Sequence, residues 1–256
     1  MRRCHDGAPM RGCAGSPGFT LLELVVVVAV IGILAAAIAP SVMQRVVDAR
    51  VEETRNEARI LHEAMIGKAG ENRFGFVGDL GRLPSSFQEL AQANGLPGYT
   101  TSTFRSVGMG WRGPYVNTGV TANDYLTDAF GRPYTGAPSG QVRSAGADGV
   151  SGNADDITYP PTAPSIAGNV VVTVKTAAGN KTVVDPTGYR VELFYASGGA
   201  EASLSDTAAP FSFSNVPMGI HAIRVVKTSN PNAGSIVSQD TITVRPTSTT
   251  AAELWF

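Results

Sequence analysis

The sequence predicts an α+β protein in which a long N-terminal transmembrane and amphipathic helix packs on a small loop-rich β head, followed by a C-terminal all-β sandwich. Three observations support this prediction: an apolar stretch at residues 19–40, a turn-rich region at residues 75–157, and several β-branched runs from residue 169 onward. With 43% hydrophobic and 16% charged residues, the composition is typical of a folded chain.

The apolar stretch FTLLELVVVVAVIGILAAAIAP, residues 19–40, has a single ionisable side chain, Glu23. As a helix it is long enough to cross a hydrocarbon core of about 30 Å. Three basic residues, Arg2, Arg3 and Arg11, precede it, and positive residues beside a first span are retained in the cytoplasm. We therefore expect one membrane span, with the long C-terminal part outside the cytoplasm.

The helix is expected to continue beyond the membrane, so that the whole helical segment covers residues 19–70. Pro40 should kink it, because proline removes one backbone donor. Residues 41 to about 69 keep apolar side chains at roughly helical spacing among Arg, Glu and Asp. This second half is expected to pack on the head and to keep its charges in solvent.

The order of the N-terminal elements differs from that of a secretory signal, which is cut after its apolar core. Here a basic leader, residues 1–18, ends at Gly18, and the apolar helix follows at once with FTLLE. The stretch GFTLLE, with Pro40 late in the helix, resembles the class III signal of type IV pilins and type II secretion pseudopilins. The resemblance implies cleavage between Gly18 and Phe19 by a prepilin peptidase, and N-methylation of Phe19.

Glu23 places a carboxylate within the apolar stretch, where a charge costs about 2.5 to 3.5 kcal/mol and needs a partner. The resemblance implies that it pairs with the α-amine of Phe19 on a neighbouring subunit and so sets the register of assembly. The alternative is that Glu23 lies near the end of the span and reaches the lipid headgroups.

The head, residues 71–158, resembles the major pseudopilin of type II secretion in three segments. They are RLPSSFQEL from Arg82, GWRGPYV from Gly110 and DAFGRPY from Asp128. The third is a close variant, because other residues commonly stand where Ala129 and Phe130 lie.

One loop of the head, SAGADGVSGNADDI at residues 144–157, is rich in Asp, Asn and Gly. Calcium takes six to eight oxygen ligands, and such a loop supplies carboxylates and exposed carbonyls. It lacks the flanking helices and terminal Glu of an EF-hand, so its residues alone favour a solvated Asp-Gly turn. The resemblance to major pseudopilins instead implies one structural calcium, held by Asp148, Asp155, Asp156 and the Ala145 carbonyl.

A linker at residues 159–168 leads to the expected sandwich, residues 169–256. We expect antiparallel strands at 169–175, 189–195, 211–216, 221–227 and 236–244, because turn residues separate these β-branched runs. The segments PTGYRVEL and FSFSNVPMGIH resemble carboxypeptidase-regulatory-like or transthyretin-like modules, which implies binding rather than catalysis. His221 is expected to be a strand residue, and Trp255 and Phe256 to belong to a final strand or to an exposed contact.

Several classes of function are disfavoured by the composition. A net charge of −1 without a basic, aromatic-lined stripe argues against nucleic-acid binding. No Ser/His/Asp, Cys/His or paired-carboxylate arrangement supports an enzyme. Both cysteines, Cys4 and Cys13, lie in the leader, so the cleaved chain would hold no disulfide.

These features predict a structural subunit of a type IV pilus-like or type II secretion pseudopilus filament. Its expected partners are further copies of itself, prepilin peptidase, an inner-membrane assembly platform with its ATPase, and other pseudopilins. It should lie in the bacterial inner membrane with its C-terminal part in the periplasm, and the filament in the periplasm or on the cell surface. The head favours type II secretion, whereas the added sandwich favours a surface pilus or a minor subunit.

A second hypothesis is a monomeric, membrane-anchored binding protein whose sandwich holds a carbohydrate or protein ligand. It predicts no role for Glu23.

Overall fold

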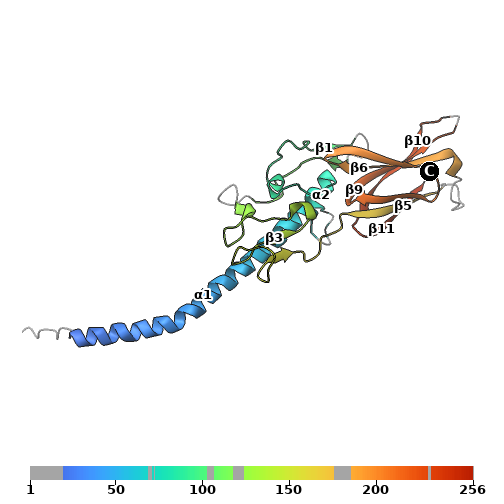
Figure 1. Ribbon diagram of the computed structural model, residues 1–256. Helices are drawn as coiled ribbons and strands as arrows, with labels where there is room; N and C mark the ends of the chain where they lie inside the picture. The colour runs from blue at the N-terminus through green and yellow to red at the C-terminus, as the bar shows by residue number, and fades with distance from the viewer. Residues whose placement is uncertain are drawn as a thin grey trace, which may run out of the picture. The chain divides into compact units, whose positions relative to one another are not determined.

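The computed structural model describes residues 20–68, 71, 73–102, 107–117, 124–175, 186–229 and 232–255 (Figure 1). The chain divides into two compact units, Met1–Asp48 and Ala49–Phe256. The predicted cleavage and methylation residues, Gly18 and Phe19, lie outside the described residues.

Helix α1 spans Leu21–Ile66 and continues through Pro40. Its first turn is capped by Thr20, whose Oγ1 accepts a hydrogen bond from the Glu23 backbone N–H at 3.2 Å. The helix ends earlier than expected because Gly67, with a φ of 93°, takes a left-handed conformation, and its N–H donates to the Glu63 carbonyl.

Within the second unit, the C-terminal half of α1 buries one face. The buried residues follow helical spacing and are Thr54, Ala58, Leu61, Ala64 and Met65. The four apolar residues among them, Ala58, Leu61, Ala64 and Met65, join the core of the head. Two short elements rich in aromatic and branched residues, α2 (Gly75–Leu80) and the 3₁₀ turn η1 (Phe87–Leu90), pack into the same core.

The rest of the head consists of short strands and turns, as its Gly- and Pro-rich composition predicts. Its strands form two antiparallel pairs, β1 (Thr100–Thr101) with β2 (Gly108–Met109), and β3 (Val142–Ser144) with β4 (Ile157–Tyr159). The remaining elements are the 3₁₀ turns η2 (Asp124–Leu126) and η3 (Ala137–Ser139). The predicted calcium loop therefore lies between β3 and β4, which hold its two ends side by side.

The C-terminal part contains two β-sheets. Its elements are β5 (Ala167–Lys175), η4 (Pro186–Gly188), β6 (Tyr189–Ser197), β7 (Ala200–Asp206), β8 (Phe211–Pro217), β9 (Gly219–Lys227), β10 (Ile236–Val244) and β11 (Thr249–Trp255). One sheet has the order β10-β9-β6-β7 and the other β11-β5-β8. Side chains from both sheets form one buried cluster, which includes Val172, Leu193, Phe211, Ile223 and Leu254, so the sheets enclose a shared core.

The prediction of purely antiparallel pairing was wrong for one pair of strands. β11 runs parallel to β5, with Thr249 opposite Asn169 and Trp255 opposite Lys175. The predicted strand at 236–244 lies in the other sheet as β10. The chain then returns as β11, which pairs with the side of β5 that β8 does not occupy. The direction of β11 could not be predicted, because alternation of apolar residues gives no information about strand direction.

The head and the sandwich meet directly at the end of α2. The Gly199 N–H, in the turn between β6 and β7, donates to the Leu80 carbonyl at 3.1 Å. Gly81, with a φ of 71°, lies so close to β6 that an added Cβ would stand 1.8 Å from the Ala196 carbonyl oxygen. Gly81 therefore permits an approach of backbone to backbone that a side chain would prevent.

Candidate assembly helix and metal loop

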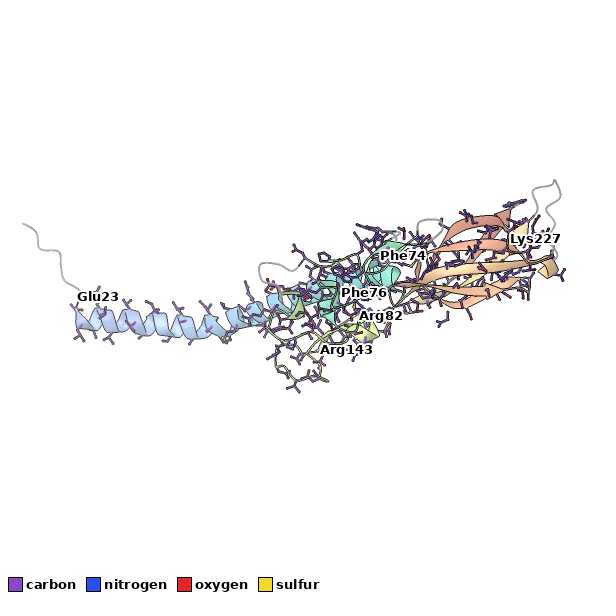
Figure 2. The ribbon with its side chains drawn as sticks, turned by 90° about the horizontal axis from the view of Figure 1, so that it is seen from above. Glu23, Phe74, Phe76, Arg82, Arg143 and Lys227 are labelled. Atoms are coloured by element: carbon purple, nitrogen blue, oxygen red, sulfur yellow. The ribbon has the colours of Figure 1, made fainter. Side chains whose placement is uncertain are left out.

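The N-terminal half of α1 exposes an unbroken apolar surface. Exposed large side chains include Leu21, Val25, Val28, Ile31 and Ile33, and Figure 2 shows the side chains projecting from the helix. In the described part of the chain, α1 is the one helix long and apolar enough to cross a membrane. Such a surface needs an apolar environment, either lipid or other helices.

Glu23 is the third residue of this helix and is exposed (Figure 2). Across the described residues, no Lys, Arg or His side chain forms an ion pair with it. An acidic residue in the first turn interacts favourably with the positive end of the helix dipole. Burial of this surface would nevertheless leave the carboxylate in need of an external cation.

Thr20 has a role in starting the helix that was not predicted from the sequence. The pattern Thr-x-x-Glu at residues 20–23 is a recognised helix-start motif in which the hydroxyl caps the N–H of the third helical residue. This signal was present in the sequence and places the start of the helix two residues after the predicted cut.

The Asp-rich loop has a network of its own hydrogen bonds. Asp148 accepts from the Val150 N–H at 2.8 Å and from the Asn153 side-chain amide at 2.7 Å. Asp155 accepts from the Asp148 N–H at 3.1 Å, and Asp156 from the Gly152 N–H at 2.6 Å. The Ala145 carbonyl accepts from the Gly149 N–H at 3.0 Å.

These hydrogen bonds hold the loop in a series of turns. They also occupy carboxylate oxygens that a calcium ion would need as ligands. Within the described ranges, no three carboxylate, imidazole or thiolate side chains are grouped as a metal site. The available donors are nevertheless all oxygens, which suits calcium. One of them, Oδ1 of Asp156, is buried and has no hydrogen-bond partner among the described residues, which is unfavourable without a cation or water.

The loop therefore has donors of the right chemistry that are not yet grouped for a metal. Binding would require the side chains of Asp148 and Asp155, which accept backbone hydrogen bonds, to rearrange toward the ion, whereas Oδ1 of Asp156 has no such bond to lose.

The remaining predicted residues lie in the sandwich. His221 lies in β9, as expected for a strand residue, and is 1% exposed. Trp255 lies in the final strand β11 and is 43% exposed, with the Lys175 ammonium 5.3 Å from its ring centroid. Phe256 lies outside the described residues.

The comparison with known proteins identifies one feature. The prokaryotic N-terminal methylation motif matches residues 15–39, which include the predicted cut, Glu23 and most of the apolar stretch. No curated protein matches the chain.

The chain therefore carries, on a long exposed apolar helix, the N-terminal methylation motif of prokaryotic prepilin-like proteins, the type IV pilin and pseudopilin class. Proteins with this motif are processed by a prepilin peptidase and have structural roles, and the apolar helix is consistent with membrane anchoring. No catalytic activity is indicated.

Proposed function

We propose that this protein is a structural subunit of a type IV pilus-like or type II secretion pseudopilus filament. In this proposal the chain is cut between Gly18 and Phe19 and assembles through the N-terminal half of α1. The observation that carries the proposal is the match of residues 15–39 to the methylation motif, on a helix whose apolar side chains are exposed.

Hydrophobic contact between copies would stabilise the assembly. Each Leu, Val or Ile that passes from water to an apolar environment contributes about 1.5 to 3 kcal/mol. In the membrane the apolar side chains already contact lipid, so they gain little hydrophobic free energy by contacting another helix. The register of one subunit against the next therefore has to come from a directional interaction. Glu23 supplies one, because its carboxylate can pair with the α-amine of Phe19 on the next subunit.

The test is the Glu23→Ala variant, expressed with its assembly machinery and compared with Glu52→Ala. Glu52 is an exposed carboxylate on the same helix, paired at 3.8 Å with Arg55, and lies beyond the apolar stretch. We expect Glu23→Ala to be inserted and processed but to yield few or no filaments in shearing and electron microscopy, while Glu52→Ala assembles normally. Normal filaments from Glu23→Ala would refute the role of Glu23 in setting register, whereas a wild type that forms no filaments with its assembly machinery would refute the filament proposal and favour the monomeric binding protein.

The proposed partners are prepilin peptidase, an inner-membrane assembly platform with its ATPase, and other pseudopilins. The C-terminal part would lie in the periplasm, and the filament in the periplasm or on the cell surface. Mass spectrometry of the membrane-extracted protein tests the processing step, because the cleaved chain should begin with a methylated Phe19. An uncleaved N-terminus in cells that contain the peptidase would contradict it.

We also propose that the Asp-rich loop binds one structural calcium ion through Asp148, Asp155, Asp156 and the Ala145 carbonyl. Calcium would offset the mutual repulsion of the carboxylates and satisfy Oδ1 of Asp156, which lacks a hydrogen-bond partner among the described residues. We expect CaCl₂ to raise the midpoint of thermal unfolding and EGTA to reverse the rise, with Asp155→Asn insensitive to both. If CaCl₂ raised the unfolding midpoint of Asp155→Asn as much as that of the wild type, calcium would be acting at a site other than this loop.

A further inference from the structure

A buried carboxylate outside the Asp-rich loop connects that loop to the rest of the head. Asp128 is 4% exposed and lies in the turn that follows η2. Its Oδ1 accepts hydrogen bonds from the Phe130 and Arg132 N–H groups, both at 2.9 Å. Its Oδ2 accepts from the Ser144 hydroxyl. A buried carboxylate with this many donors is held firmly in one position.

The first connection to the loop passes through Ser144, the last residue of β3. Ser144 is 3% exposed, and its Oγ, while donating to Asp128, accepts from the Gly146 N–H at 3.1 Å. Gly146 in turn lies against Asp155, since an added Cβ would stand 2.6 Å from Asp155 Oδ2. The position of Gly146 therefore restricts where the Asp155 carboxylate can lie.

The second connection passes through Arg132. While its N–H is bound to Asp128, its guanidinium donates to the Gly146 carbonyl. The same guanidinium packs against Gly149, where an added Cβ would lie 2.5 Å from its Cζ. Within the part of the chain that the structure describes, Arg132 forms no ion pair. It therefore holds the loop through the loop's backbone carbonyl at Gly146 and leaves the Asp carboxylates available for a metal ion.

The turn that contains Asp128 is also attached to helix α1. The Ala129 N–H donates to Oγ1 of Thr54 at 3.3 Å, and Thr54 is completely buried in α1. Asp128 thus lies between the helix on one side and two separate contacts to the loop on the other.

We infer that Asp128 is a positioning residue for the loop at residues 145–156 and acts through Ser144 and Arg132. This inference rests on the calcium role proposed above for the same loop. Groups that hold metal ligands in place typically change metal affinity by about 10- to 100-fold when they are removed. The Asp128 carboxylate does not itself bind the ion; it fixes the backbone on which Asp155 is carried.

The experiment uses the full mature chain in detergent and CaCl₂ as the probe, with affinity measured by isothermal titration calorimetry. The variant Asp128→Asn keeps the shape of the side chain, but its amide nitrogen cannot accept from the Ser144 hydroxyl. Ser144→Ala removes the same link with a smaller change. Glu201→Gln, in the exposed part of β7, is the control for loss of one negative charge.

We expect Asp128→Asn and Ser144→Ala to weaken calcium binding by at least about tenfold, with Glu201→Gln unchanged. Wild-type affinity in a folded Asp128→Asn variant would overturn the inference. If Asp128→Asn fails to fold by circular dichroism, Ser144→Ala decides in the same way.

Hydrogen exchange without calcium separates this inference from the calcium proposal. The Gly146 and Asp148 amides should exchange faster in Asp128→Asn and Ser144→Ala than in the wild type, because their loop is no longer tied to β3. If the wild type binds no CaCl₂, the calcium proposal fails while faster exchange still supports the positioning role. Unchanged exchange in both variants would refute it.

Discussion

Acidification is expected to destabilise the sandwich through His221. The ring is buried in β9, with Nε2 2.6 Å from the Pro217 carbonyl oxygen and the edge of the ring against Tyr195 at a centroid distance of 6.2 Å. Nδ1 is buried without a hydrogen-bond partner among the described residues. Burial lowers the pKa of His221, and the Pro217 carbonyl opposes that shift only in part.

The sign and size of the effect follow from this geometry. A neutral ring donates from Nε2 to Pro217, whereas a protonated ring adds a donor at Nδ1 that faces no acceptor. Because the pKa of the folded state lies below the ordinary value of 6.5, the unfolded chain binds the extra proton first. Stability is then fully present well above pH 6.5 and falls as the pH drops through 6.5, by at most about 1.4 kcal/mol per pH unit, until the folded-state pKa is reached.

The assay is urea unfolding of the mature chain in detergent at pH 7.5, 6.5 and 5.5, followed by tryptophan fluorescence. His221→Gln is the test variant, because its side-chain amide can donate to the Pro217 carbonyl but cannot titrate. The difference in unfolding free energy between wild type and variant should narrow or reverse by up to about 1 kcal/mol between pH 6.5 and 5.5.

A second histidine requires its own control. Burial also lowers the pKa of His62, whose Nδ1 lies 3.1 Å from the Gly140 carbonyl oxygen, so it contributes to the acid sensitivity of the wild type. His62→Asn removes this contribution, and the effect of His221→Gln should persist in that background. A pH-independent difference between wild type and His221→Gln would refute the reasoning.

Three substitutions test the packing of the head and sandwich. Leu193→Ala, in the fully buried core between the sheets, should lower the free energy of unfolding by about 2 to 5 kcal/mol in urea titrations; a loss below about 1 kcal/mol would contradict the shared core. Gly81→Ala should force α2 away from Ala196 and increase protease cleavage there, whereas an unchanged digest would show that the close approach is dispensable. Tyr134→Phe removes the hydroxyl that donates to Glu57 at 2.6 Å and should cost about 1 to 3 kcal/mol in thermal unfolding, with no change if water replaces it.

The long helix and the loop-rich head could be predicted because their residue patterns, apolar or amphipathic in the helix and rich in Gly and Pro in the head, match the surroundings that these segments have in the fold. Twenty or so apolar residues followed by a helical pattern of polar and apolar side chains have few alternatives to a helix. The end of the helix was less certain, because it depends on the left-handed conformation of Gly67, and several glycines in that region could have served equally.

In the sandwich, prediction succeeded for strands that bury branched residues and failed for β7. That strand reads AEASLSD, with small and polar side chains that are mostly exposed, and it forms one edge of its sheet. Its pairing with β6 comes from backbone hydrogen bonds and a tight turn at Gly198 and Gly199. Such a strand has little of the apolar alternation on which recognition from sequence depends.

The candidate sites differ in how far sequence could define them. Glu23 stands out because a lone carboxylate in an apolar run needs an explanation. The roles of Asp128 and Ser144 could not be recognised, because their hydrogen bonds join segments that only the folded head brings together. Calcium binding by the loop stays a prediction.

The parallel pairing of β11 with β5 has a consequence for the order in which the sandwich can form. β5 is the central strand of its sheet and the first to be synthesised, but its partner on one side is the last strand of the module. Until β11 has been synthesised, β5 keeps one unpaired edge and Leu254 is missing from the core. Completion of this sheet depends on non-local pairing, which is slow in general, and the incomplete chain would have to be kept from pairing with other chains through that edge.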